Sequence, residues 1–222
     1  MTVPRLYDAA VPEMMDRPGN DPGLLRADLD ALQTINRFLG GYRIPLRYLA
    51  KFRPTTILDL ATGAGDVPRA LPRHIQITAV DSNPDILQIA RERSTGFANI
   101  RFEQHNLLAL PFAPGSFDVV LCSLALHHFA EADVVAILRR VRDIARVGFI
   151  VNDLRRHRLA IALSKLMART IIRNPIARFD APASCERAFT VAELDALAQR
   201  AGLTNYRIRR HVWFRMALVG AK

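Results

Sequence analysis

A short apolar run that passes at once into a glycine-bearing turn constrains the fold of this chain most strongly. The run covers residues 56–60, and the turn reads Asp59-Leu-Ala-Thr-Gly63-Ala-Gly65-Asp66. The run has the length and composition of a buried strand. Gly63 and Gly65 let the backbone turn tightly and approach a ligand without an intervening Cβ atom. This pattern predicts an α/β fold with a ligand bound at the end of its first strand.

Strand and helix signals alternate along the rest of the chain. Further strands are predicted over residues 75–80, 100–103, 117–122, 147–151, 204–209 and 212–219, the last two as a hairpin. Helices are predicted over residues 24–39, 45–51, 83–93, 132–145 and 156–172, and after a capping box at Thr190 and Glu193. Residues 174–189 are predicted to form a loop. Such alternation predicts a doubly wound, seven-stranded, mostly parallel sheet, which binds ligands at the carboxyl ends of its strands.

Length and composition narrow the class of protein. The chain has 222 residues, of which 50% are hydrophobic and 23% charged, so it can bury a core and is neither disordered nor fibrous.

We predict an N-terminal arm and helical lid over residues 1–54 and a main domain over residues 55–222, with residues 156–189 as a substrate-side insertion. Two cysteines, the lack of a signal-peptide pattern and the lack of a long apolar run predict a cytoplasmic protein.

The acidic residue at the end of the second strand, Asp81, suits a ribose cis-diol. A dinucleotide fold would place a third glycine where Pro68 stands, and a carboxylate such as Asp59 would repel a pyrophosphate. A cofactor with an ammonium group and no phosphate tolerates Asp59. These residues therefore favour S-adenosyl-L-methionine over a dinucleotide.

Residues 55–151 resemble the class I S-adenosylmethionine-dependent methyltransferases, with a Rossmann-like fold, in four motifs: DLATGAGD, AVDSN, HNLLALPF and FDVVLCSLALHHF. The pattern is similar to that of ubiquinone/menaquinone-biosynthesis and polyketide-associated small-molecule methyltransferases. Ala61 stands where many members have glycine, and Asn106 where many have an acidic residue. The resemblance implies that Asp81 holds the ribose and Asn106 accepts a hydrogen bond from the adenine. The cofactor-binding residues it implies are Asp59, Ala61, Gly63, Gly65, Asp81, Ser82, Asn106, Leu107 and Ser123.

Candidate catalytic residues follow the fourth and fifth strands. His127 or His128 can deprotonate a phenol or an acidic carbon near neutral pH, and Asp153 can orient a histidine or polarise a hydroxyl. The alternative is that the two histidines only shape the pocket. Arg155, Arg156 and His157 offer an anion-binding site or a solvated helix start. No metal site is predicted.

The predicted acceptor is a small hydrophobic molecule, phenolic, quinone-like or polyketide, with O-methylation slightly favoured over C-methylation. The net charge of +10 leaves an RNA-modifying enzyme as an alternative, because residues 151–222 hold 14 Lys and Arg against 5 Asp and Glu. A nucleic-acid partner is not favoured, since no Asn/Asp-Pro-Pro-aromatic signature follows the fourth strand. A non-catalytic cofactor-binding partner protein is the other alternative. The basic helix predicted over residues 156–172 suits contact with an anionic membrane, and the oligomeric state is predicted as monomer or homodimer.

Overall fold

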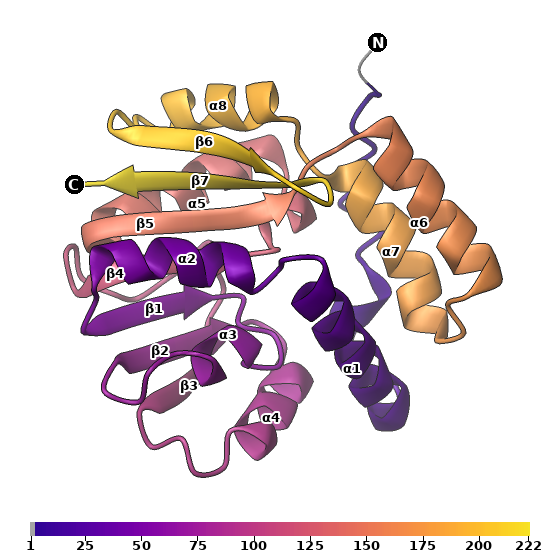
Figure 1. Ribbon diagram of the computed structural model, residues 1–222, viewed down its shortest axis with the longest axis horizontal. Helices are drawn as coiled ribbons and strands as arrows, with labels where there is room; N and C mark the ends of the chain where they lie inside the picture. Colours follow the sequence, from indigo (N-terminus) through magenta and orange to yellow (C-terminus); the bar gives the residue numbers. More distant parts are fainter. Residues whose placement is uncertain (1–2) are drawn as a thin grey trace.

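The computed structural model describes residues 3–222, which form a seven-stranded sheet flanked by helices (Figure 1). The strands are β1 (Thr56–Leu60), β2 (Gln76–Asp81), β3 (Ile100–Gln104), β4 (Phe117–Ser123), β5 (Ala145–Leu154), β6 (Tyr206–His211) and β7 (Arg215–Ala221). Their order is β3-β2-β1-β4-β5-β7-β6, and within the described chain only β7 runs against the others. The predicted doubly wound, mostly parallel sheet and its closing hairpin are confirmed.

The chain reverses its direction of winding between β1 and β4. Both strands are buried apolar runs, and they pair in register from Ile57 with Val119 to Leu60 with Cys122. In a sheet of this kind the loops at the carboxyl ends of the two strands at such a switch point leave a crevice for a ligand. The glycine turn after β1 and the His127-His128 segment after β4 therefore follow neighbouring strands at the carboxyl edge of the sheet, where such a crevice is expected.

The helices lie on both faces of the sheet and beyond its carboxyl edge. They are α1 (Pro22–Phe38), α2 (Arg43–Phe52), α3 (Asp66–Arg69), α4 (Pro84–Arg93), α5 (Glu131–Ile144), α6 (Arg158–Thr170), α7 (Pro175–Arg187) and α8 (Val191–Arg200), with 3-10 turns at Met14–Asp16 and Leu126–His128. The apolar faces of α5 and α8 share one core cluster with the sheet, and α2 packs on the opposite face through Leu49. The arrowheads of β1 and β5 point toward α1, α6 and α7 (Figure 1).

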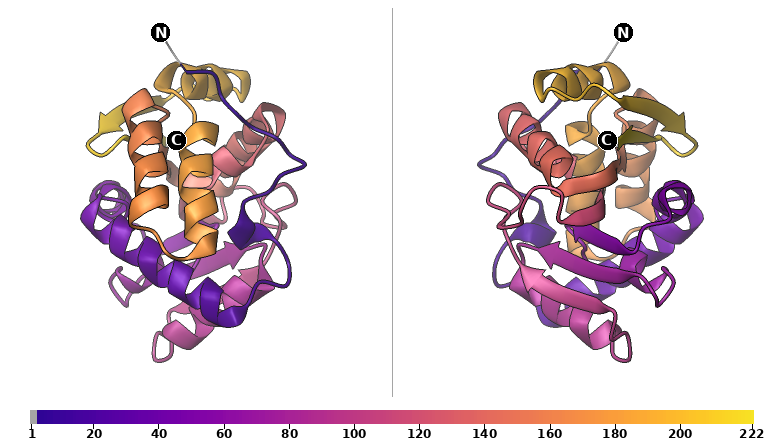
Figure 2. Two further views of the ribbon diagram at one scale, coloured as in Figure 1. Left: turned by 90° about the vertical axis from the view of Figure 1, so that its right-hand side faces the viewer. Right: turned by 90° about the vertical axis from the view of Figure 1, so that its left-hand side faces the viewer.

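One predicted element is wrong. Residues 174–189 were expected to form a loop, but Pro175–Arg187 is a helix. Its two prolines and its weak amphipathic pattern hide it from sequence reasoning. Asn174 caps the helix by accepting the Ile176 N–H, Pro175 suits the first turn, and Pro182 merely leaves one carbonyl without its intrahelical donor. Helix α7 lies alongside α6 in both views of Figure 2. Packing against α6 stabilises α7 more than its own helix propensity does.

The segment before α1 is an irregular arm, as predicted, of which residues 1 and 2 lie outside the described part of the chain. The arm crosses α7, where the Asp180 carboxylate accepts the backbone N–H groups of Met14 at 2.6 Å and Met15 at 3.0 Å. Across residues 3–222 we find no helix whose length and apolar character would suit a membrane span.

Candidate functional site

The turn after β1 adopts left-handed backbone angles at three positions, with φ of 52° at Ala61, 56° at Gly63 and 76° at Gly65. A non-glycine residue strains this conformation, which explains why glycine is the usual residue at position 61 in the family that the turn resembles. A Cβ on Gly65 would lie 3.1 Å from the Phe102 ring, so this glycine packs against the sheet. A Cβ on Gly63 would meet no described atom within 4 Å, so the turn is open on that side.

Asp81, at the carboxyl end of β2, holds the turn in place. Its Oδ2 accepts the Gly63 N–H at 3.0 Å, and its Oδ1 accepts the Asn83 N–H at 3.1 Å. Burial raises the pKa of Asp81, and the hydrogen bonds from Asn83 and Gly63 oppose that rise. Each carboxylate oxygen keeps a second lone pair, so Asp81 can accept further hydrogen bonds from a bound diol.

Asp59 lies within β1 and is 3% exposed. The Thr62 hydroxyl donates to its Oδ2 at 2.6 Å. Burial raises the pKa of Asp59 to about 7, which the Thr62 hydrogen bond limits and the nearby Asp81 reinforces. Two buried carboxylates next to an open turn favour a positively charged ligand group there, because such a group would offset their desolvation.

The remaining predicted cofactor residues also lie at the carboxyl edge of the sheet, but they differ in exposure and in hydrogen-bond partners. Ser82 and Asn106 are exposed, and Leu107 is buried. The Oδ1 of Asn106 accepts the Leu108 N–H at 2.9 Å, so the oxygen assigned to the adenine already has one local partner. Ser123 Oγ accepts a hydrogen bond from Asn152 Nδ2 at 2.8 Å.

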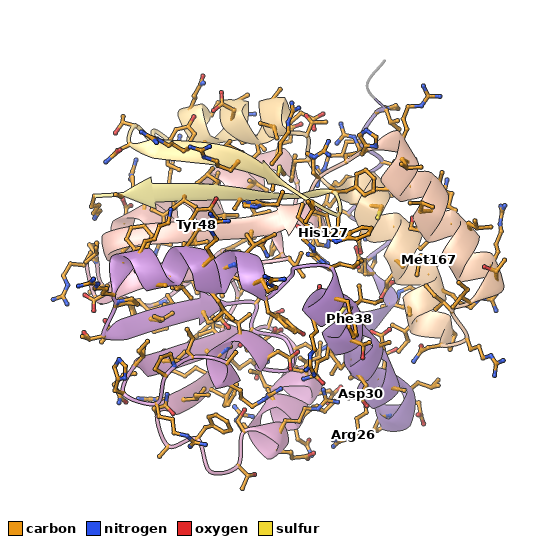
Figure 3. All side chains as sticks on the ribbon, viewed as in Figure 1. Arg26, Asp30, Phe38, Tyr48, His127 and Met167 are labelled. Carbon is orange, nitrogen blue, oxygen red and sulfur yellow. The ribbon has the colours of Figure 1, made fainter. Side chains whose placement is uncertain are left out.

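His127 and Asp153 form a buried pair at the exits of β4 and β5. His127 Nδ1 lies 2.7 Å from Asp153 Oδ1, and the His127 backbone N–H donates to Asp153 Oδ2 at 3.2 Å. The two residues are 3% and 2% exposed. Although burial raises the pKa of Asp153, the neighbouring His127 lowers it below its usual value, so Asp153 is an anion. Figure 3 places His127 between the sheet and the helices α6 and α7.

His128 points to the arm instead. Its Nδ1 lies 2.8 Å from Asp16 Oδ2. Burial lowers the pKa of His128, but the Asp16 hydrogen bond and the carboxylates of Glu13, Asp16 and Asp153 raise it to about 9. The ring centroids of the two predicted histidines lie 4.3 Å apart, but their Nδ1 atoms pair with different elements, that of His127 with Asp153 of the sheet and that of His128 with Asp16 of the arm.

Sequence reasoning missed the arm carboxylates Glu13 and Asp16. Glu13 is 2% exposed; Ser184 Oγ donates to its Oε2 at 2.8 Å, and Arg187 Nη1 lies 3.6 Å from its Oε1. The contacts join positions 171 and 174 residues apart. The one feature of the sequence that points to Glu13 is that it is an acidic residue within an otherwise apolar stretch. Such residues are too common for this feature to identify a site.

Arg156 is not part of a solvated helix start, as its place in the sequence suggested. It is 5% exposed, pairs with Glu193, and donates to the backbone carbonyls of Val3 and Ala188. The Arg156 guanidinium therefore links the arm to α8. His157 caps α6 by accepting the Leu159 N–H and stacks on the Phe214 ring.

Asp28 in α1 is a buried charge close to the arm. It is 1% exposed, and neither of its carboxylate oxygens has a hydrogen-bond partner among residues 3–222. Burial raises its pKa to about 7, and the carboxylates of Asp180 and Glu13 add to the rise.

We expect Asp28→Asn to change how stability depends on pH. Because burial raises the folded-state pKa of Asp28 from 3.8 to about 7, the folded chain holds a proton that the unfolded chain has lost between these two pH values, so the free energy of unfolding falls as pH rises from about 4 to about 7 and then levels off. The asparagine variant lacks this charge. The free energy of unfolding of the variant, minus that of the original chain, should therefore be about 2 kcal/mol larger at pH 9 than at pH 5, after allowance for solvent screening. Urea unfolding at both pH values measures it. Asp85→Asn, at an exposed position of α4, is the control, and a constant difference for Asp28→Asn would contradict the prediction.

Known proteins share both the motif region and the fold. A family model described as a methyltransferase domain matches residues 57–148. Demethylmenaquinone methyltransferase of Porphyromonas gingivalis is 40% identical over 91 residues, which cover 38% of this chain and 37% of the relative. The chain spans little more than a third of the curated relatives it matches.

Two solved structures extend the likeness to most of the chain. A SAM dependent methyltransferase from Aquifex aeolicus has a TM-score of 0.65 at 16% identity and covers 90% of this chain and 98% of its own. Human N-acetylserotonin methyltransferase, solved in complex with SAM, has a TM-score of 0.68 at 18% identity, covering 91% of this chain and 56% of its own. At such identities the likeness is one of fold.

Proposed function

We propose that this chain, a member of the class I S-adenosylmethionine-dependent methyltransferases, transfers a methyl group from S-adenosyl-L-methionine to a small hydrophobic acceptor. The observation that carries the proposal is the position of the His127–Asp153 pair, buried at the exit of β4 beside the glycine turn of β1. An acceptor base and a cofactor-binding turn then share one crevice.

The residues of the β1 and β2 ends fit this cofactor. Asp81 would hold the ribose hydroxyls with the oxygens that already fix the turn, and Asp59 would favour the ammonium of the methionine part. The open side of Gly63 leaves room for the cofactor chain. The cofactor supplies an electrophilic methyl group on a sulfonium. The protein supplies proximity and alignment, which account for most of the acceleration in an in-line displacement.

The acceptor must lose a proton, and His127 is placed to take it. In this proposal the Asp153 carboxylate accepts the Nδ1–H of His127, and Nε2 is the atom that takes the proton. Nε2 accepts the proton of a phenolic hydroxyl, while Asp153 stabilises the imidazolium that forms. The same proton transfer serves O-methylation of a phenol and C-methylation of an acidic carbon, and we propose O-methylation first.

The acceptor class is inferred from two features. One of the matching curated relatives is, by its printed name, a demethylmenaquinone methyltransferase, which puts quinone-type and phenolic acceptors first among candidates. In this proposal the arm and α1, from the predicted lid over residues 1–54, act together with α6 and α7, from the predicted insertion over residues 156–189, to cover the carboxyl edge of the sheet. Leu159, Leu163 and Leu166 of α6 are exposed next to basic residues, which suits contact with an anionic membrane that delivers such an acceptor.

The test has two stages. Calorimetric titration of the purified chain with S-adenosyl-L-methionine should show micromolar binding, and the same titration with NAD should show none. Methyl-labelled cofactor should then label phenols or reduced naphthoquinones, with product NMR separating O-methyl from C-methyl. Absence of cofactor binding overturns the proposal. Cofactor binding with label only in RNA supports the RNA-modifying alternative, and binding without any labelled acceptor supports the non-catalytic one.

A further inference from the structure

Three side chains that can bind a metal ion meet where the arm covers the exit of β4. Glu13, His127 and His128 each offer one ligand atom, and these atoms all lie within 4.8 Å of one another. Glu13 and His127 are 2% and 3% exposed, and the side chain of His128 is 20% exposed. The cluster is therefore largely enclosed by protein, unlike a surface group of acidic residues.

Both imidazoles are held in the orientation that metal-binding histidines have. Nδ1 of His127 lies against Asp153, and Nδ1 of His128 lies against Asp16. A carboxylate on Nδ1 directs a metal ion to Nε2, where the ion takes the place of the Nε2 proton that His128 carries at neutral pH. Nε2 of His127 lies 4.0 Å from Glu13 Oε1.

Glu13 itself lacks a hydrogen-bond partner at the oxygen that faces His127. Oε1 is buried and unpartnered within residues 3–222, while Ser184 holds Oε2 and the Arg187 guanidinium stays 3.6 Å from Oε1. A buried carboxylate oxygen without a hydrogen bond is unfavourable. A cation between Oε1 and the imidazoles would remove that penalty.

We propose that Glu13, His127 and His128 bind one divalent transition-metal ion, of the class of Zn²⁺ that prefers imidazole nitrogen. Zinc–nitrogen bonds of about 2.0–2.1 Å require tetrahedral ligand atoms to lie about 3.4 Å apart, so the 4.0 Å separation must contract by less than about 1 Å. Three protein ligands leave a coordination position for water or for an acceptor oxygen, which is the pattern of an open metal site. The carboxylates of Asp16 and Asp153 complete the outer shell.

Metal binding has a direct consequence for the proposed methyl transfer. An imidazole whose Nε2 binds a metal ion has no lone pair left to accept a proton, so His127 cannot act as a base while the ion is bound. The ion also joins the arm to the β4 exit, because Glu13 is its only ligand from the arm. Binding of the metal is independent of cofactor binding and is measured without S-adenosyl-L-methionine, so the failure of one proposal does not imply the failure of the other.

The experiment titrates chelator-treated protein with Zn²⁺ by calorimetry and with Co²⁺ by visible absorption. We expect one ion per chain at micromolar affinity or tighter, and the intense d–d bands of a four-coordinate Co²⁺ site. Glu13→Gln keeps a group that can pair with Ser184 but carries no charge, and should weaken binding at least about tenfold. His128→Asn should do the same. His74→Gln, at an exposed position outside the cluster, is the matched control and should bind as the original chain does.

Circular dichroism and thermal unfolding establish that each variant is folded. Zn²⁺ should raise the midpoint of unfolding of the original chain and of His74→Gln, and this rise should be lost in Glu13→Gln and His128→Asn. The proposal is overturned if the original chain binds neither ion at micromolar concentration. It is also overturned if the folded cluster variants bind as tightly as His74→Gln does, since the ion would then lie elsewhere.

Discussion

We expect His127→Gln to lower the rate of methyl transfer by about 100-fold or more and to leave the affinity for S-adenosyl-L-methionine unchanged. Glutamine approximates the size of the imidazole and can still hydrogen-bond to Asp153, but it cannot accept a proton. The side chain belongs to the β4 exit and not to the glycine turn, so cofactor binding should not depend on it. Single-turnover rates with labelled cofactor, together with calorimetric affinities, separate the two effects.

The measurement is made in the presence of a chelator, so that a change in metal binding does not contribute. His74→Gln serves again as the control. His128→Gln is informative because His128 pairs with the arm and not with Asp153, and we expect a smaller loss of rate. Undiminished turnover in His127→Gln would show that the histidine shapes the pocket without removing a proton.

Asp81→Ala should weaken the binding of S-adenosyl-L-methionine at least about tenfold, which corresponds to about 1.4 kcal/mol or more. Two changes act together. The ribose loses its carboxylate acceptor, and the Gly63 N–H loses the bond that holds the turn after β1 in its left-handed conformation. Calorimetric titration of the variant measures the loss.

Asp81→Asn separates these two contributions, because the amide oxygen can still accept the Gly63 N–H while the charge is lost. We expect its affinity to fall between those of the original chain and of Asp81→Ala. Asp85→Ala, four positions along the chain and exposed, should bind normally. A folded Asp81→Ala variant with normal affinity would place the cofactor elsewhere.

The sheet was predictable because its strands are short, buried apolar runs bounded by turn residues. Such signals are local. Gly63 of the β1 turn and Asp81, which accepts its N–H, lie only 18 positions apart in the sequence. Helix α7 was not predictable, because its stability comes from packing and its prolines are typical of a loop. Tertiary contacts override weak local propensity in such segments.

The residues of the candidate site also differ in whether the sequence could predict them. His127 and Asp153 are each adjacent to a strand end, so the parallel sheet alone brings them together from 26 positions apart. Glu13 and Asp16 reach the same place through an irregular arm, whose path depends on Asp180 of an unpredicted helix. No periodicity links position 16 to position 128, so the arm contacts need a structure to be found.

The path of the arm also bears on when the proposed base is accessible. With residues 13–16 in place, the His127 side chain is 4% exposed, and no acceptor can reach its ring. With His127 as the proposed base, each turnover would require the arm to leave and return. The arm would keep water from His127 between those two events, and the hydrogen bonds of Met14 and Met15 to Asp180 would be part of the barrier to entry. The rate at which such a chain admits its acceptor would then depend on residues 3–16, which are far in sequence from the histidine that they cover.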